Sequence, residues 1–592
     1  MTRRTAEERP DGPVPRHDGA AVPQPAGGPD RAAPRLRARR WVAPAVASSV
    51  TAALVLAFSA WDGQLVLDAP AGQAPDTAVA TASGSALVGA AALGCPGPEL
   101  LGVDGDEQRE QQVTVTAAAA PRRVVRAAES PSDAAGADIE AKAELSATGG
   151  AGDAPVDLVG GAGSLTLDTA AGALVLASGP AAPGLVAGQL GQSTAAGTRG
   201  LSLTACSAPA ETLWLVGGGA SPGRTEHLVL TNPGDDAVTV DVAVWGAEGP
   251  AARTGTDEIV VPARGRTVHL LDALAPSVES PVLRVRSRGG PVTAYLGEDY
   301  RERTVDLGAE VVTASAPPST DLVVPSVDAD GPERLPGRTM TLRLAAPGDA
   351  AAVVDVTALT ERGAVTLPGA VTRVPAGRTV DVALGDLPEG VLGLRLRSDV
   401  PVTAGARLEV PPTGDEPLPP DEAGASEEPE DGDSPGSRGD DTSSTSGADG
   451  GASADPDGPP ILRPAGETAW VAATTPSLTP LGMAVPATDG VPGARAGLVV
   501  TVVDAADVVV HTLAADGTVR QEELGRVPND TSRAVDLRAD TRAVWVSVTG
   551  GVGVVASVLL SGADRRGPYL AASTVPGTPW SRPVADVTVL GP

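Results

Sequence analysis

One short stretch of this chain gathers the acidic and aromatic side chains that could act on a sugar. Its members are Glu298, Asp299, Glu302, Tyr295 and Tyr300. Paired carboxylates on either side of a glycosidic bond are the catalytic groups of most glycan hydrolases. Sugar sites usually add exposed aromatic rings, but the chain has only one Phe, three Tyr and seven Trp. We therefore keep a hydrolase as the alternative function, and expect these acids and His269 to be scattered over the surface.

Histidine and serine motifs are weaker candidates. His227, His269 and His511 fall on three different expected strands. No acid–histidine spacing around them is typical of a metal site or a catalytic triad, so we interpret them as surface or strand-edge residues. Residues 432–436 fit Gly-x-Ser-x-Gly, but that elbow needs a strand before it and a helix after it, and here it lies in an acidic low-complexity stretch. We expect no catalytic residues, metal or cofactor, and hence no enzyme.

The tripeptide Gly-Arg-Thr recurs in the chain and has two interpretations. Its positions are 223–225, 265–267, 337–339 and 377–379. Gly and Thr suit a turn that leads into a strand, with the Arg as a solvated residue that protects a strand edge. Alternatively, the arginines form a row that grips an anionic glycan through bidentate hydrogen bonds. We favour the structural interpretation.

Two stretches of similar sequence, 228–242 and 342–356, lie 114 residues apart. The similarity continues downstream, and a fainter third copy covers residues 498–548. Repetition at a fixed period indicates that one structural unit is used again. Within each unit, apolar residues alternate with polar ones, as in Val238 to Val244, and Pro-Gly-Asp or Gly-Arg-Thr separates short Val- and Thr-rich runs. Seven or eight strands in about 110 residues predict an immunoglobulin-like β-sandwich, whereas a propeller blade needs only about 40 to 50 residues.

Residues 41–61 contain no charged side chain and span about 31 Å as a helix, which matches a bilayer core. Arginines precede the segment and aspartates follow it, so the positive-inside rule keeps residues 1–40 in the cytoplasm and exports the rest. The alternative is a cleaved signal peptide, with the best but weak cleavage site at residues 57–59. We favour an uncleaved single-pass anchor in the cell membrane, because the apolar run is longer than a typical signal peptide requires.

Cys95 and Cys206 are the two cysteines of the chain, and both fall on the exported side of the predicted anchor. In an oxidising compartment an isolated pair most often forms a disulfide, and we predict a Cys95–Cys206 bond. Two separate buried thiols are the alternative. A zinc site needs more ligands than this pair offers.

Charge separates along the chain in the same way. Residues 1–40 carry nine Arg and five acids, a net charge of +4. Since the whole chain has a net charge of −30, the remaining residues carry −34. So acidic an exported part argues against nucleic acid and anionic headgroups as partners. Between 411 and 460, 14 acids accompany Arg438 alone among Pro, Gly and Ser. This composition predicts a self-repelling, disordered linker between the second and third copies.

These observations predict a mainly β protein, with tandem immunoglobulin-like β-sandwich domains after a single N-terminal transmembrane helix. The expected divisions are a disordered tail (1–40), the anchor (41–61), a divergent β domain (65–210), repeat 1 (211–318), repeat 2 (319–410), the acidic linker (411–460) and repeat 3 (461–592).

A combination of short motifs resembles a known family. The motifs are residues 95–98, Cys206, 214–219, 228–235 and 245–249. Together they resemble an actinobacterial family of uncharacterised, membrane-anchored secreted proteins that are encoded beside large envelope glycosyltransferases. That family has no assigned activity, so the resemblance supplies no catalytic residues. It implies a setting in the cell envelope, with an envelope glycan or the membrane glycosyltransferase machinery as partner. We therefore expect a non-enzymatic, extracytoplasmic scaffold or binding protein that is accessory to glycan assembly.

Overall fold

The computed structural model describes residues 78–589, without 99–111, 129–139, 151–154, 159–160, 168–170, 253–257, 327–336, 386, 389, 414–462 and 552. The predicted tail, the predicted anchor and residues 414–460 of the predicted linker lie outside the described residues. The described part is mainly β, built from many antiparallel sheets, as the sequence predicted. Its helices are all too short or too polar to cross a membrane.

Residues 82–584 form one compact unit. The flanking strands β1 (Ala78–Leu87) and β35 (Ser581–Val589) pair in a two-stranded sheet. Inside the compact unit, alternation in the sequence becomes alternation of burial. In β22 (Ala352–Thr360), the even-numbered residues 352 to 358 are buried, and Val353 and Asp355 are exposed. Successive side chains of a strand point to opposite faces, so this pattern places one face against an apolar core.

The N-terminal sandwich consists of two four-stranded sheets. Its strands are β2 (Ala90–Cys95), β3 (Gln112–Ala118), β4 (Lys142–Ala147), β5 (Val156–Asp157), β6 (Ala162–Leu167), β7 (Ala173–Ser178), β8 (Val186–Ser193) and β9 (Gly200–Ala205). One sheet has the order β2-β7-β4-β5 and the other β6-β3-β8-β9. The helix α2 (Arg122–Ala128) and the turns η2 (Thr148–Gly150) and η3 (Gly179–Ala181) connect strands. An apolar core rich in Ala fills the space between the sheets.

Sandwich 1 corresponds to predicted repeat 1. Its elements are β10 (Thr212–Val216), β11 (Arg224–Thr231), β12 (Val238–Gly246), β13 (Gly249–Pro250), β14 (Ile259–Val261), β15 (Arg266–Leu270), α3 (Leu271–Leu274), β16 (Val282–Arg288), β17 (Thr293–Glu302), β18 (Val305–Val312) and β19 (Ala314–Ser315). One sheet has the order β13-β12-β16-β10-β19, with β14 also paired to β12, and the other has the order β15-β11-β17-β18.

Sandwich 2 is closed by a strand from beyond the acidic segment. Its strands are β20 (Ser319–Val324), β21 (Thr339–Ala346), β22, β23 (Gly363–Val374), β24 (Arg378–Leu384), β25 (Val391–Val410) and β26 (Glu467–Ala472). The long β25 belongs to both sheets, pairing with β20 and β22 through its first half and with β21 and β26 through its second half. Predicted repeat 3 began at residue 461, whereas β26 extends the sheet of β25.

Sandwich 3 follows directly. Its strands are β27 (Leu481–Ala484), β28 (Arg495–Val502), β29 (Ala506–Ala514), β30 (Val519–Val527), β31 (Thr531–Leu537), β32 (Thr541–Thr549), β33 (Val554–Asp564) and β34 (Gly567–Thr574). The two sheets have the orders β27-β32-β29-β30 and β31-β28-β33-β34.

All four sandwiches share one strand order in the described residues, if β13 and β14 count as one strand, the two halves of β25 count as two, and β19 is left out. One sheet holds the first, third, fourth and sixth strands, and the other holds the second, fifth, seventh and eighth. In each sandwich the eighth strand lies at the edge of its sheet, as β9, β18, β26 or β34. The N-terminal sandwich is therefore a further copy of the repeat, although its sequence does not reveal the repetition.

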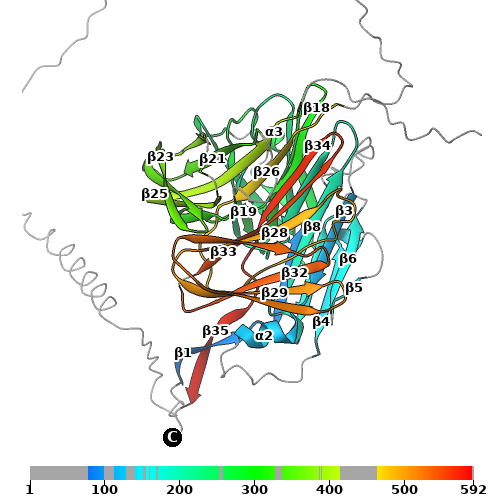
Figure 1. Ribbon diagram of the computed structural model, residues 1–592. Coiled ribbons are helices and arrows are strands. Elements are labelled where there is room, and N and C mark those ends of the chain that lie inside the picture. The colour runs from blue at the N-terminus through cyan, green and yellow to red at the C-terminus, as the bar shows by residue number, and fades with distance from the viewer. Residues whose placement is uncertain are drawn as a thin grey trace, which may run out of the picture. The chain divides into compact units, whose positions relative to one another are not determined.

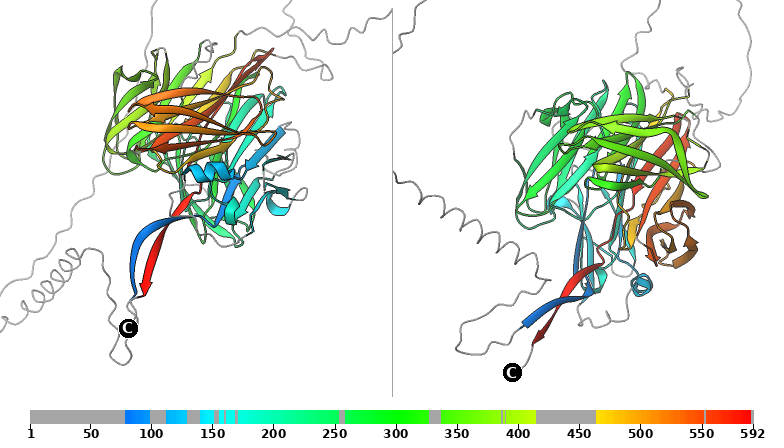
Figure 2. Two further views of the ribbon diagram at one scale, coloured as in Figure 1. Left: turned by 60° about the horizontal axis from the view of Figure 1, so that its bottom comes forward. Right: turned by 90° about the vertical axis from the view of Figure 1, so that its left-hand side faces the viewer.

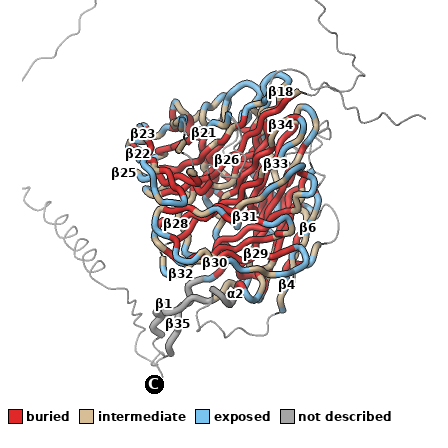
Figure 3. Tube along the Cα trace, in the orientation of Figure 1, coloured by how far each residue is buried: buried red, intermediate tan, exposed pale blue. Residues whose placement is uncertain are grey.

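The four sandwiches contact one another in cyclic order through these eighth strands. β9 contacts β18, β18 contacts β26, β26 contacts β34, and β34 contacts β9. Figure 1 shows β26 and β34 side by side, and Figure 3 shows buried residues concentrated along both. The N-terminal sandwich and sandwich 3, far apart in sequence, lie next to each other (Figure 2), where the Trp545 indole donates to the Gly184 carbonyl at 2.8 Å.

Candidate functional site

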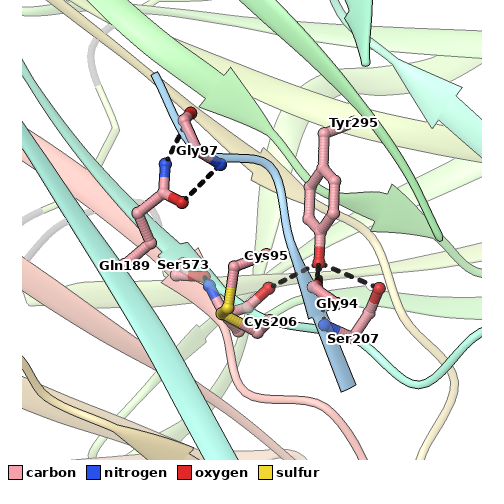
Figure 4. Close-up of a disulfide and its surroundings, with 9 residues drawn as sticks. Gly94, Cys95, Gly97, Gln189, Cys206, Ser207, Tyr295 and Ser573 are labelled. Atoms are coloured by element: carbon pink, nitrogen blue, oxygen red, sulfur yellow. Dashed lines mark hydrogen bonds between the residues drawn. A yellow bond between two sulfur atoms is a disulfide. The ribbon is translucent and has the colours of Figure 1, made fainter. Parts of the chain in front are cut away.

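The two cysteines meet where the N-terminal sandwich joins sandwich 1 (Figure 4). Cys95 ends β2 and Cys206 directly follows β9, and their sulfur atoms are bonded at 2.01 Å with the Cα atoms 4.6 Å apart. Both side chains are buried. The disulfide therefore ties the first strand of this sandwich to the end of its eighth strand, at the point where the chain crosses to sandwich 1.

Neutral hydrogen bonds reinforce this seam, which we call the disulfide seam. The Tyr295 hydroxyl of β17 donates to the Gly94 carbonyl at 2.7 Å and accepts from the Ser207 N–H at 2.7 Å (Figure 4). Burial raises the pKa of Tyr295 to about 12, so the hydroxyl stays protonated. The Gln189 side-chain amide accepts a hydrogen bond from the Gly97 N–H at 2.8 Å and donates one to the Gly97 carbonyl at 3.1 Å.

Strand geometry separates the acidic cluster that the sequence singled out. Glu298 is fully buried, Asp299 is half-buried and Glu302 is exposed, all on β17. Neighbouring residues of a strand point to opposite faces, so Glu298 and Asp299 diverge. His269 is half-buried on the edge strand β15, opposite Leu228. The expectation that all four side chains lie on the surface is therefore wrong for Glu298.

Glu298 instead anchors a buried ionic network between sandwiches 1 and 2, the ionic seam. Its Oε2 accepts a hydrogen bond from the Trp470 indole of β26 at 2.7 Å, and its Oε1 pairs with the Arg224 guanidinium. Arg224 also pairs with Glu409 of β25 at 2.9 Å and lies 3.7 Å above the ring of Tyr300. Both oxygens of the best catalytic candidate are thus engaged by partners within the fold.

A second buried arginine extends the ionic seam. Arg343 of β21 binds Asp381 through two hydrogen bonds of 2.8 Å and donates to the Gly218 carbonyl at 2.8 Å. Asp381 also accepts a hydrogen bond from the Ser280 hydroxyl at 2.9 Å. Burial is the largest single influence on the pKa of Asp381 and raises it, but the hydrogen bonds and charge of Arg343, with Ser280 and Arg407, together outweigh burial and lower the pKa. The carboxylate is therefore charged at neutral pH and complements the guanidinium.

Two glutamates lie among the central eighth strands. Glu310 of β18 and Glu467 of β26 are fully buried. Burial raises the pKa of both carboxyl groups well above the usual value, although backbone N–H groups of β18, β26 and neighbouring strands favour the charged form. For Glu310 these donors include the N–H of Val311 at 2.8 Å. Both glutamates are therefore expected to hold a proton to unusually high pH.

Ion pairs between three of the sandwiches lie at the beginning of the eighth strands, beside a backbone carbonyl of sandwich 2. Arg199 of the N-terminal sandwich pairs with Asp564 of sandwich 3 at 3.0 Å and donates to the Gly466 carbonyl beside β26. Arg566 of sandwich 3 pairs with Asp306 of sandwich 1, and both side chains are buried. These contacts join copies that are hundreds of residues apart in sequence.

The arginines of the Gly-Arg-Thr motifs stand at strand starts but have different surroundings. Arg224 has a side chain that is 2% exposed and belongs to the ionic seam. Arg266 donates to the Pro98 carbonyl at the disulfide seam. Arg378 is 44% exposed and lies near Glu248. The three therefore share neither a solvated edge position nor a common glycan-binding row.

The three histidines His227, His269 and His511 do not form a site in the described residues. His227 and His511 are buried in sandwiches 1 and 3, and burial, with Arg123 nearby, lowers the pKa of His511. Burial likewise lowers the pKa of His269. Within the described residues, no group of three or more His, Cys, Asp or Glu side chains is placed to hold a metal ion.

Four important charged residues were not singled out from the sequence. They are Arg199, Glu310, Arg343 and Glu467. Arg343 stands between Leu342 and Leu344, an alternation that predicts a solvent-facing side chain. The sequence therefore carried no signal that sandwich 1 covers this face, where Arg343 donates to the Gly218 carbonyl.

Comparison with known proteins finds a family model that matches part of the chain. No curated protein and no solved structure matches the chain. Over residues 161–431, from β6 to beyond β25, the chain matches the model of a family of unknown function, DUF5719.

Proposed function

We propose that this protein is a non-enzymatic, membrane-anchored scaffold or binding protein of the actinobacterial cell envelope, accessory to glycan assembly. The disulfide supports export, because such bonds persist in oxidising compartments and are rare in the cytosol. The arginine-flanked apolar run at 41–61 supports anchoring with the N-terminus in the cytoplasm. The resemblance to secreted proteins encoded beside envelope glycosyltransferases supplies the setting.

The observation that carries a scaffold role is how the buried charges are used. Glu298 binds Trp470 and Arg224, Arg343 binds Asp381, and each interaction holds one sandwich to the next or secures a strand at that seam. Function has to be argued from a site, and these groups serve cohesion between repeats. A cyclic array held by buried contacts presents its outer sheet faces and loops in fixed relative positions, as a display platform requires.

We also propose that each sandwich is a variant of the immunoglobulin-like class. The pairing of the second with the fifth strand, the third with the sixth, and the third with the fourth supports this assignment, since B–E, C–F and C–C′ pairs define that fold. The first and the seventh strand of each sandwich depart from that fold. The first strand pairs with the sixth and the seventh with the second, the reverse of the usual A–B and F–G neighbours.

Crosslinking in intact cells tests the scaffold role. A photo-reactive residue would replace Val260, Val371 or Leu478, whose side chains are 60, 65 and 67% exposed, and the buried Leu344 would be the control position. We expect at least one exposed position to capture the membrane glycosyltransferase whose gene the family resemblance places beside that of this protein, and Leu344 to capture nothing. No capture from any exposed position, together with reduced cysteines in intact cells, would contradict the proposal.

A purified-protein assay separates the proposal from the hydrolase alternative. We expect no release of sugars from envelope glycan by the full chain. Release that is abolished in a folded Glu298→Gln variant, but retained in Glu302→Gln at the exposed end of β17, would overturn the non-enzymatic assignment.

A further inference from the structure

Sandwich 3 has an open groove at one end. Its volume is about 480 Å³, within the usual range of small-molecule sites. The lining comes from the loop after β27, the start of β28, the end of β31, and the turn between β31 and β32. The lining residues are Val485, Pro486, Thr488, Ala494, Arg495, Ala496, Asp536, Leu537, Arg538, Ala539 and Thr541.

The groove exists because the connection from the fifth to the sixth strand is short in this copy. In sandwich 1 the corresponding connection contains α3, and Leu271 packs into the core there. In sandwich 2 the corresponding connection places Leu387 against the core. In sandwich 3, β31 ends at Leu537 and β32 begins at Thr541, whose N–H bonds the Arg538 carbonyl at 2.9 Å. So tight a turn supplies no side chain to cover the end of the sandwich.

Two arginines line the groove beside its apolar residues. Ala496 pairs with Leu537 in the β28–β31 ladder, and Arg495 and Arg538 are the chain neighbours of this pair. Both arginines are exposed and line the groove. A cleft that is lined by charges of one sign attracts a counter-ion of the opposite sign.

The surrounding acids neutralise these arginines only in part. Asp540 lies 3.4 Å from Arg538, but its closer partner is Arg520 at 2.7 Å. Arg495 forms no ion pair among the described residues, and Asp536 contributes one carboxylate to the lining. With two arginines and one aspartate, the lining thus carries a net positive charge on a chain whose total is −30, and guanidinium groups suit bidentate recognition of an oxyanion.

We propose that this groove binds a small organic anion. Its carboxylate or phosphate lies between Arg495 and Arg538, and its body covers the apolar floor formed by Val485, Ala496 and Leu537. The inference goes beyond the proposed function, because it requires neither the anchor nor an envelope partner.

Calorimetric titration of the full chain tests the site. The probes are glucuronate and glucose 6-phosphate, which separate a carboxylate from a phosphate source, with inorganic phosphate and uncharged glucose beside them. The variants are Arg495→Gln and Arg538→Gln, with Arg526→Gln as the matched control, because Arg526 is an exposed arginine of sandwich 3 outside the groove. Unchanged thermal unfolding of all three variants establishes that they fold.

We expect at least one anionic sugar to bind and glucose to bind at least about tenfold more weakly. Each groove variant should lose about tenfold or more in affinity, since a hydrogen bond to a charged group contributes about 1.5 to 3 kcal/mol. Arg526→Gln should bind as the unaltered protein does. Absence of binding by both anionic sugars, or equal binding by all three variants, would overturn the proposal. Inorganic phosphate binding as tightly as glucose 6-phosphate would overturn the role of the apolar floor.

Discussion

The disulfide seam and the ionic seam solve the same problem with different chemistry. At the disulfide seam, the Cys95–Cys206 bond and the Gln189 amide fix the end of the N-terminal sandwich. The Tyr295 hydroxyl and the Arg266 guanidinium of sandwich 1 donate to neutral backbone carbonyls there. At the ionic seam, Arg224, Glu298 and Glu409 are charged, and the first two are almost fully buried. Removing one partner of a buried ion pair leaves an uncompensated charge, whereas removing a neutral hydrogen bond costs less free energy of unfolding. The comparison teaches that the ionic seam depends on individual paired charges. At the disulfide seam, a covalent bond fixes the end of the N-terminal sandwich, and hydrogen bonds from sandwich 1 bind that fixed end.

Removal of the disulfide should produce the largest effect. The bond closes a loop with a sequence separation of 111 residues, for which the loop-entropy model predicts about 5 kcal/mol. We expect a Cys95→Ser, Cys206→Ser double variant to lose stability of that order in urea unfolding. Thiol labelling of the native, non-reduced protein should modify neither cysteine. Labelling of both, or an unchanged unfolding midpoint in the double variant, would show that this seam does not rest on the covalent link.

A single substitution at the ionic seam should cost somewhat less. Arg224→Met leaves the buried Glu298 without its cation, and we expect a loss of about 3 to 4 kcal/mol in the free energy of unfolding. The matched control is Arg264→Met, since Arg264 pairs with Asp235 at 2.8 Å with both side chains largely exposed. Such an exposed pair contributes at most about 1 kcal/mol. Equal losses in the two variants would remove the distinction between a buried seam and surface charge.

The strands were predictable because their pattern is local. The similar stretches 228–242 and 342–356 became β11 with β12 and β21 with β22, and Pro-Gly-Asp lies between the strands each time. The N-terminal sandwich escaped detection as a copy because much of its core is Ala, including Ala117, Ala143 and Ala173. Small side chains resemble loop composition, so its periodicity is weak in the sequence.

The seams were not predictable in the same way. Trp470 lies 172 residues from Glu298, and Asp564 lies 365 residues from Arg199. Periodicity shows that a residue faces inward or outward along its own strand, but it does not show which distant strand covers that face. For the same reason Glu298 looked like a surface acid beside Asp299, until β26 supplied the indole that binds it.

The buried glutamates Glu310 and Glu467 on the eighth strands differ from the ionic seam, because burial favours their protonated form. Burial raises the pKa of Glu310 and Glu467, so the folded protein retains protons that the unfolded chain releases near pH 4.5. The stabilising contribution is fully present below that pH and is lost as the pH rises through the folded pKa values. We expect a smaller effect than at either seam, because each carboxyl group can stay protonated rather than remain buried as an unpaired charge.

Stability measured from pH 4.5 to 9 checks this expectation. Glu310→Gln mimics the protonated side chain and should reduce the loss of stability with rising pH, relative to the unaltered protein. The control Glu302→Gln, at an exposed position of β17, should leave the pH dependence unchanged. Identical pH profiles for all three proteins would mean that the central carboxyl groups do not titrate differently in the folded and unfolded states.

The smallest effect is expected from cutting the chain between β25 and β26. A specific protease site placed among residues 414–462 separates the two strands in the sequence, but Gly405 to Val410 still pair with Glu467 to Ala472 on the other side of the cut. β26 also contacts β18 and β34, and Trp470 binds Glu298. We therefore expect the cut protein to elute as one particle with an almost unchanged unfolding midpoint. Dissociation into two fragments would instead indicate that the connection, and not the seams, holds sandwiches 2 and 3 together. Combining the cut with Arg224→Met sharpens the comparison, because the ionic seam then has to retain β26 without its central cation.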